Sequence, residues 1–126
     1  MKNKNSSCPF CNLDRIIITE SESSFAIFDG FPVSKGHALI IPKNHCANYF
    51  ELSFKEQYDC MALLNEVKMI IQKKFNPDGF NVGININEAA GQTIPHVHIH
   101  LIPRYVGDVE KPAGGIRGVI PEKKEY

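Results

Sequence analysis

The sequence predicts an α+β domain in which one long helix packs on an antiparallel sheet of about five strands. Short segments of β-branched and aromatic residues lie on both sides of one long helical pattern, and capping residues delimit that helix. A very short turn separates the last two predicted strands, and such a turn joins antiparallel neighbours because parallel strands need a long crossover. The 126 residues suit one domain with its own core.

The first three predicted strands precede the helix and are short. Residues 15–19 and 24–28 are rich in β-forming side chains, and the polar segment 20–23 between them predicts a hairpin. A loop of Gly, Pro and Ser residues leads to a third strand at residues 37–41. We expect that strand to end at Pro42, because proline has no N–H to donate to a strand ladder.

The long helix is predicted over residues 53–75. Ser53 and Glu56 have the spacing of a capping box, in which each side chain accepts a hydrogen bond from the backbone N–H of the other residue. The turn residues 76–79 end the helix. Apolar side chains at helical spacing predict its buried stripe, which comprises Phe54, Tyr58, Met61, Leu64, Val67, Ile71 and Phe75.

The last two strands are predicted at residues 80–86 and 94–102, with a turn at residues 87–91. In an extended strand alternate side chains share a face, so one face of residues 94–102 is aliphatic and the other carries imidazoles. Imidazolium charges along one face repel each other, which favours neutral rings that are each tied to a partner, a ligand or a metal. This strand holds three of the five histidines of the chain, namely His96, His98 and His100.

Both ends of the chain lie outside the predicted sheet. Residues 1–7 are polar, and we expect them to be disordered. Residues 106–126 are rich in Gly, Pro and charge, and we expect them to lie on the surface or against a partner subunit. Because no linker or repeat divides the rest, the sequence predicts a single domain over residues 8–126.

Composition excludes several classes of function. The fourteen basic and fourteen acidic residues cancel, so nothing indicates a nucleic-acid polymer as partner. No apolar run approaches the roughly 20 residues that span a bilayer, and the N-terminus lacks the apolar stretch of a signal peptide. We therefore expect a cytoplasmic protein without a membrane partner, whose four cysteines are reduced thiols or metal ligands.

The turn before the histidines carries groups that can bind an anion. Gln92 and Thr93 follow Gly91, and their side chains can donate hydrogen bonds to a phosphate or a leaving-group oxygen. An ordinary hairpin turn would use the same residue types, so this segment by itself supports both interpretations.

Residues 91–104 resemble the signature of the histidine triad (HIT) superfamily of nucleotide hydrolases and transferases. That signature is His-φ-His-φ-His-φ-φ, where φ is hydrophobic, and here it reads His-Val-His-Ile-His-Leu-Ile after Gly-Gln-Thr. Upstream, Asp29 and Gly36-His37 precede a strand ending in Ile-Pro-Lys, as in the nucleotide-pocket segment of the family. The resemblance covers about residues 8–108 and implies a HIT-like fold.

The resemblance implies a role for each matching residue. His98 would be the nucleophile that attacks the α-phosphorus and forms a nucleotidyl-histidine intermediate. His100 and His37 would contact the α-phosphate oxygens, and Asp29 would bind the ribose hydroxyls. Asn87 stands where similar sequences often have Gly, and asparagine tolerates left-handed backbone better than most residues. The remaining nucleotide and leaving-group contacts would come from Asn85, Gly91, Gln92 and Thr93.

Cys8 and Cys11 have the spacing of a zinc knuckle, although two unrelated thiols would share it. A redox pair is disfavoured because no strand precedes the motif and no helix follows it. His45 and His96 are the candidates for the two further ligands. Zinc-carrying branches of the HIT superfamily use these four positions, so the resemblance implies a structural Zn²⁺ site. A closed tetrahedral site leaves no position for substrate, and zinc would not perform the chemistry.

Further residues resemble particular branches of the family. Thr93 and the pair at 107–108 resemble the dinucleoside polyphosphate branch, and residues 114–121 resemble bacterial diadenosine tetraphosphate hydrolases. Val97 stands where galactose-1-phosphate uridylyltransferase relatives have proline, which argues against that branch. The resemblance implies hydrolysis of dinucleoside polyphosphates, whose phosphates would carry Mg²⁺ or another divalent cation. Similar proteins pair through the long helix and the adjoining strand, so a homodimer is implied.

Alternative functions remain open from the sequence. One is a nucleoside phosphoramidase or acyl-nucleotide hydrolase of the same family. Another is a nucleotide-binding regulatory module without turnover, which the complete set of His37, His98 and His100 disfavours. A third is a metal-handling protein, in which Asp29 and Gln92 would have no role.

Overall fold

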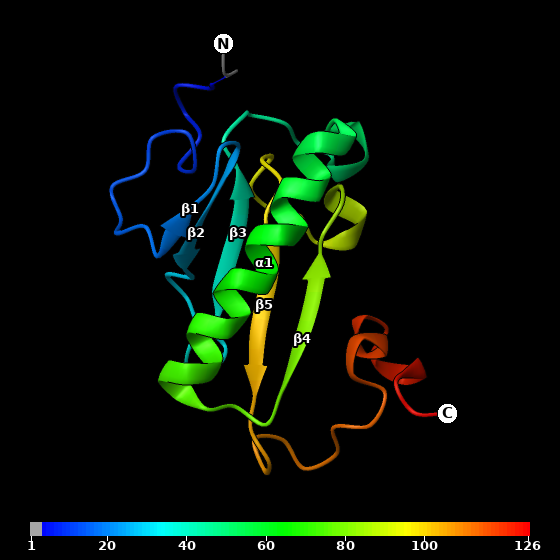
Figure 1. Cartoon of the computed structure of the whole chain (residues 1–126). Coiled ribbons are helices and arrows are strands. Elements are labelled where there is room, and N and C mark those ends of the chain that lie inside the picture. Colours follow the sequence, from blue (N-terminus) through cyan, green and yellow to red (C-terminus); the bar gives the residue numbers. More distant parts are fainter. Residues whose placement is uncertain (1–3) are drawn as a thin grey trace.

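A five-stranded antiparallel sheet with one long helix against it forms the centre of this computed structural model, which describes residues 4–126 (Figure 1). The strand order is β1-β2-β3-β5-β4, which confirms the predicted α+β class. Residues 1–3 of the segment predicted to be disordered lie outside the described residues. The elements are β1 Thr19–Glu20, β2 Ser24–Phe28, β3 Ala38–Pro42, α1 Phe54–Phe75, β4 Gly79–Ile84 and β5 Ile99–Arg104.

The two faces of the sheet have different neighbours. Helix α1 covers one face, where its residues Leu63 and Val67 pack against Ile40 and Leu101 of the sheet. The N-terminal segment covers part of the other face, where a second apolar cluster contains Cys8, Phe10, Phe25, Ile27, Leu39 and Ile41. Leu39 pairs with His100 in the β3–β5 ladder. Because paired residues share a face, His100 points away from the helix.

Helix α1 starts and ends as predicted, but its buried stripe differs. Both hydrogen bonds of the Ser53–Glu56 capping box are present, and Asn76 ends the helix in the left-handed conformation. The prediction is wrong for Phe54 and Tyr58, which are 88% and 78% exposed, because at about 100° per residue both lie on the side of the helix opposite to Val67. The fully buried positions are instead Cys60, Leu63, Val67 and Ile71.

Three predicted strands are shorter in the structure, and one of them is β4, which ends at Ile84 and not at residue 86. Only Thr19 of the range 15–19 lies in β1, and Ile16 is 90% exposed. The range 94–102 was too long at its start, because β5 begins at Ile99 and leaves His96 and His98 in the preceding irregular segment. There the N–H of Val97 donates to the carbonyl of Cys46 instead of joining a ladder. Backbone groups bound by loops are unavailable to a sheet, which explains the late start of β5.

Short 3-10 helices connect and follow these elements: Tyr49–Glu51, Glu88–Ala90, Gly115–Val119 and Pro121–Lys123. The last two belong to the tail, which turns back beside β4 (Figure 1). No helix among residues 4–126 is long and apolar enough to cross a membrane.

Candidate active site and metal centre

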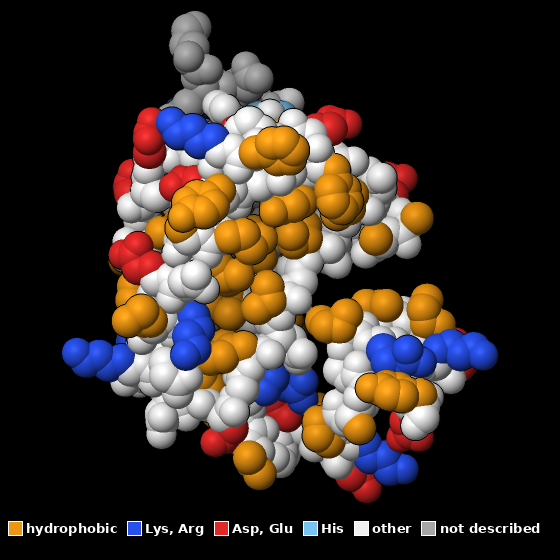
Figure 2. Space-filling model, turned by 45° about the vertical axis from the view of Figure 1, so that its right-hand side comes forward, with side chains coloured by type: hydrophobic (Ala, Val, Ile, Leu, Met, Phe, Trp, Pro, Cys, Tyr) orange, Lys and Arg blue, Asp and Glu red, His pale blue; other side chains and the backbone are white. Residues whose placement is uncertain are grey.

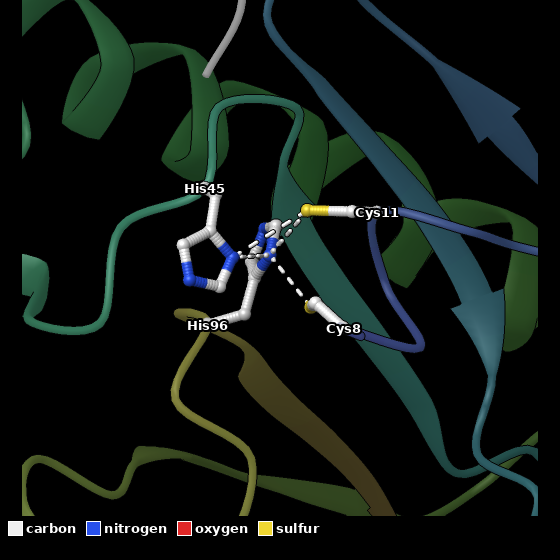
Figure 3. A group of neighbouring side chains, drawn as sticks. All are labelled: Cys8, Cys11, His45 and His96. Carbon is white, nitrogen blue, oxygen red and sulfur yellow. Dashed lines mark hydrogen bonds between the residues drawn. The ribbon is translucent and has the colours of Figure 1, made fainter. Parts of the chain in front are cut away.

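The four residues proposed as metal ligands come together although they are far apart in sequence (Figure 3). Their ligand atoms all lie within 4.8 Å of one another. The Nδ1 atom of His96 lies 3.4 Å from Cys8 Sγ, 3.6 Å from Cys11 Sγ and 3.2 Å from His45 Nδ1. Zinc bonds of about 2.1 Å to nitrogen and 2.3 Å to sulfur give a tetrahedron with edges of about 3.4–3.8 Å. The four residues therefore fit a Cys2His2 metal site.

Hydrogen bonds of the surrounding residues suit metal binding. His96 Nε2 lies 2.7 Å from the carbonyl oxygen of Pro42, which can only accept, so Nε2 carries the proton and Nδ1 has its lone pair free. Burial lowers the pKa of His96, and a metal-ligating imidazole must be neutral. The N–H of Asn5 donates to Cys11 Sγ at 3.3 Å. Burial raises the pKa of the Cys8 thiol, so a cation is needed to hold it as thiolate.

The candidate nucleophile, His98, is hydrogen-bonded to the backbone of this cluster. His98 Nδ1 lies 2.8 Å from the carbonyl oxygen of His96, so Nδ1 donates and Nε2 keeps a lone pair. Phe10, between the two cysteines, packs edge-on against both rings, with centroids 5.8 Å from His96 and 5.2 Å from His98. The metal centre and the nucleophile thus share a carbonyl and an aromatic neighbour.

Asp29, His37 and His100 form a second group on the same face of the sheet. His37 Nε2 lies 3.0 Å from His100 Nδ1 and 3.4 Å from Asp29 Oδ2. The ring of His100 lies 5.2 Å from that of His98 between centroids. Burial lowers the pKa of His100 to about 4, with smaller contributions from His98 and His37. The group therefore presents neutral imidazoles beside one carboxylate at neutral pH.

The turn that carries the other predicted contacts is fixed by its own hydrogen bonds. Gln92 Oε1 accepts from the N–H of Asn87, and its Nε2 donates to the carbonyls of Ala47 and Ile94. Asn87 and Gly91 both have positive φ, of 72° and 90°. Thr93 is exposed, and Asn85, just after β4, is half-buried. The amide of Gln92 therefore holds the loop in shape.

A cavity lies beyond His100 at the far end of β5, and none of His37, His98 and His100 lines it. Along β5, Ile102 and Arg104 follow His100 at alternate positions, and they line a cavity of 640 Å³ together with Val33 and Ser34. Arg104 forms an ion pair with Asp108 and donates to Asn81, so its charge is already paired within the protein.

The sequence offered no signal for the backbone N–H of Val33, which donates to His37 Nδ1 at 3.1 Å. Phe10 could have been noticed as the aromatic residue inside the cysteine pair.

Comparisons with known proteins agree with this geometry. A family model described as HIT domain matches residues 12–107. An adenosine 5'-monophosphoramidase from Schizosaccharomyces pombe is 38% identical over 78% of the chain and 74% of the relative. A bis(5'-adenosyl)-triphosphatase from Dictyostelium discoideum is 36% identical over 75% of the chain and 63% of the relative. A Zn-bound histidine triad protein from Mycobacterium smegmatis superposes with a TM-score of 0.75 at 32% identity, covering 81% and 78%.

Proposed function

This chain belongs to the HIT family, and on that premise we propose that it hydrolyses dinucleoside polyphosphates at the α-phosphate through a nucleotidyl-histidine intermediate. The main support is the orientation of His98, whose Nδ1 donates to the carbonyl of His96 and leaves Nε2 free to attack. Neutral imidazole is nucleophilic near pH 7. Relatives named for phosphoramidate and phosphoanhydride substrates support nucleotide hydrolysis as the reaction class.

The proposed reaction has two displacements. First, His98 Nε2 forms a bond to the α-phosphorus, the bond from that phosphorus to the leaving nucleotide breaks, and the leaving oxygen remains charged or takes a proton from solvent. Water then attacks the same phosphorus, the P–N bond breaks, and one proton is released. The products are a nucleoside monophosphate, the shortened nucleotide and neutral His98.

Around this step we assign contacts by position. His100 donates to the α-phosphate oxygens, His37 supports it, and Asp29 accepts from the ribose hydroxyls. Asn85 and Gly91 border the phosphate site, and Gln92 and Thr93 border the leaving group.

We assign two metal ions to different roles. Cys8, Cys11, His45 and His96 would hold one structural Zn²⁺, which would supply charge to keep the thiolates ionised and would pin the N-terminus to the catalytic segment. A divalent cation such as Mg²⁺ would arrive with the substrate, held mainly by phosphate oxygens.

A turnover panel tests the substrate class. With Mg²⁺ present, we expect kcat/KM for diadenosine tetraphosphate or triphosphate to exceed that for an adenosine phosphoramidate by about tenfold or more, equivalent to about 1.4 kcal/mol of transition-state binding. A preference for the phosphoramidate would assign the chain to the alternative hydrolase branch. Tight nucleotide binding without turnover would indicate a regulatory module, and the absence of any nucleotide binding would favour metal handling.

We also propose that the protein forms a homodimer through α1 and β4. Among residues 4–126, β4 pairs in the sheet only with β5, so its outer backbone groups can pair with a second copy. Hydrophobic side chains gather over the adjoining face in Figure 2. On α1 and β4 the exposed hydrophobic residues include Phe54, Tyr58 and Val82, which are 88%, 78% and 42% exposed. A contiguous apolar face beside a sheet edge is typical of subunit contacts.

Light scattering in solution tests this interface. We expect the mass of a dimer for the natural chain and of a monomer for Val82→Glu, because a carboxylate on the β4 face would be buried without a partner. Ile16→Glu is the matched control and should stay dimeric, because Ile16 is 90% exposed and precedes β1, which forms the edge of the sheet opposite to β4. A monomeric natural chain would contradict the proposal.

A further inference from the structure

Asp29, His37 and His100 form a second cluster of side chains of the types that bind metals. One hydrogen bond to His37 distinguishes this cluster from the cluster of Cys8, Cys11, His45 and His96. The backbone N–H of Val33 points at His37 Nδ1 from 3.1 Å. A backbone N–H can only donate, so Nδ1 of His37 must be the lone-pair nitrogen. His37 is 3% exposed, and burial lowers its pKa, so the ring is neutral and its single proton is on Nε2.

The proton on His37 Nε2 determines how His37 interacts with His100 and Asp29. His37 Nε2–H donates to His100 Nδ1 at 3.0 Å, with Asp29 Oδ2 at 3.4 Å as a second, longer acceptor. A metal ion needs a lone pair on the nitrogen that faces it, and His37 Nε2 has none in this arrangement. The group is thus organised as a chain of hydrogen bonds, whereas Cys8, Cys11, His45 and His96 present lone pairs to a common centre.

We propose that His37 is a positioning residue: the N–H of Val33, acting through His37, fixes His100 as the tautomer that carries its proton on Nε2. This inference rests on the proposed function, because the Nε2–H of His100 would then be a permanent donor to the α-phosphate oxygen. A donor that is already oriented stabilises the charge that develops on that oxygen in the transition state. In this proposal His37 contacts His100 and not the phosphate.

The loop that carries Val33 is built to hold that N–H in place. The N–H of Asp29 donates to the carbonyl of His37, and the N–H of His37 donates to the carbonyl of Ser34. Gly36 has φ of 90°, and a Cβ there would lie 2.8 Å from the ring of Phe75. The loop between β2 and β3 therefore packs closely on Phe75, and its backbone hydrogen bonds hold it beside His37.

Nitrogen NMR of the ¹⁵N-labelled full chain tests the inference directly, because protonated and unprotonated imidazole nitrogens differ strongly in chemical shift. We expect Nε2–H tautomers for His37 and His100 and an Nδ1–H tautomer for His98. An Nδ1–H tautomer of His100, or a rapid exchange between its two forms, would overturn the proposal. This measurement needs no substrate, so it decides the tautomer even if the proposed activity is absent.

Val33→Pro removes the backbone N–H, and Val33→Ala is the matched control that keeps it. We expect the proline variant to lose its Nε2–H preference at His100 and to lose about tenfold or more in kcat, with KM changed by less than about threefold. The alanine variant should keep the tautomer and retain at least about tenfold more kcat than the proline variant. Equal kcat and equal tautomers in the two variants would overturn the proposal.

A second pair of variants avoids strain from proline. In His37→Gln the amide reaches the position of Nε2 and can still donate to His100, whereas in His37→Asn it reaches only the position of Nδ1. We expect the glutamine variant to retain at least about tenfold more kcat than the asparagine variant. Equal or higher kcat for the asparagine variant would show that donation to His100 is not what His37 supplies. If the natural chain itself did not hydrolyse the substrate, that result would instead contradict the proposed function.

Discussion

His98→Ala is expected to reduce kcat for dinucleoside polyphosphate hydrolysis by about 10⁴-fold or more while the nucleotide dissociation constant changes by less than about threefold. The reason is that the P–N bond of the proposed intermediate can form only at His98, whereas the other contacts to the nucleotide come from different side chains. The hydrogen bond from His98 Nδ1 to the carbonyl of His96 is local, so its loss should leave the fold intact. Single-turnover kinetics and equilibrium binding would measure the two quantities.

Covalent trapping provides the control for this variant. Rapid acid-free quenching of the natural enzyme during turnover should yield a fraction of chains that carry one nucleoside monophosphate on His98, visible by intact-mass and peptide mass spectrometry. The alanine variant should carry none. If it still hydrolysed substrate at the natural rate, the nucleophile would have been assigned to the wrong residue.

Removal of the metal is expected to have the second-largest effect. Protein purified without added metal should contain about one zinc atom per chain, and Cys11→Ser should lose it. We expect a fall in melting temperature of more than about 10 °C, equivalent to roughly 3 kcal/mol for a domain of this length. Turnover should fall as well, because Phe10 and His96 contact His98 and both are held by the metal cluster. Elemental analysis, calorimetry and kcat would measure these changes.

Cys46→Ser is the matched control for the metal site. Cys46 is also half-buried, but it lies outside the cluster, and its Sγ donates to the carbonyl of Asn48 at 3.3 Å. A serine hydroxyl can make the same hydrogen bond, so this variant should keep its zinc, its melting temperature and its kcat. A metal-free chain that melted and turned over like the natural one would exclude a structural zinc.

Local sequence signals predicted secondary structure well where neighbouring residues determine it, as at the ends of α1. The capping box of Ser53 and Glu56 sets the start of α1, and the left-handed Asn76 sets its end. Each signal lies within a few residues of the helix end that it determines. The buried stripe was predicted less well, because Phe54 and Tyr58 lie on the side of the helix opposite to Val67 and face away from the sheet. Apolar residues at helical spacing predict an apolar face, but they do not report which side of the helix the sheet covers.

The alternating histidines illustrate the same limit at the site. Their spacing and the surrounding motif determined the family, the predicted nucleophile and the four ligand positions, because each depends on residue type and order along the chain. Only the tertiary structure decided which ring nitrogen carries the proton in His96 and in His37. That choice depends on the carbonyl of Pro42 for His96 and on the N–H of Val33 for His37, which are groups that every residue type possesses. Since backbone donors and acceptors leave no mark in a sequence, their effect on the histidines appears only when the chain is folded.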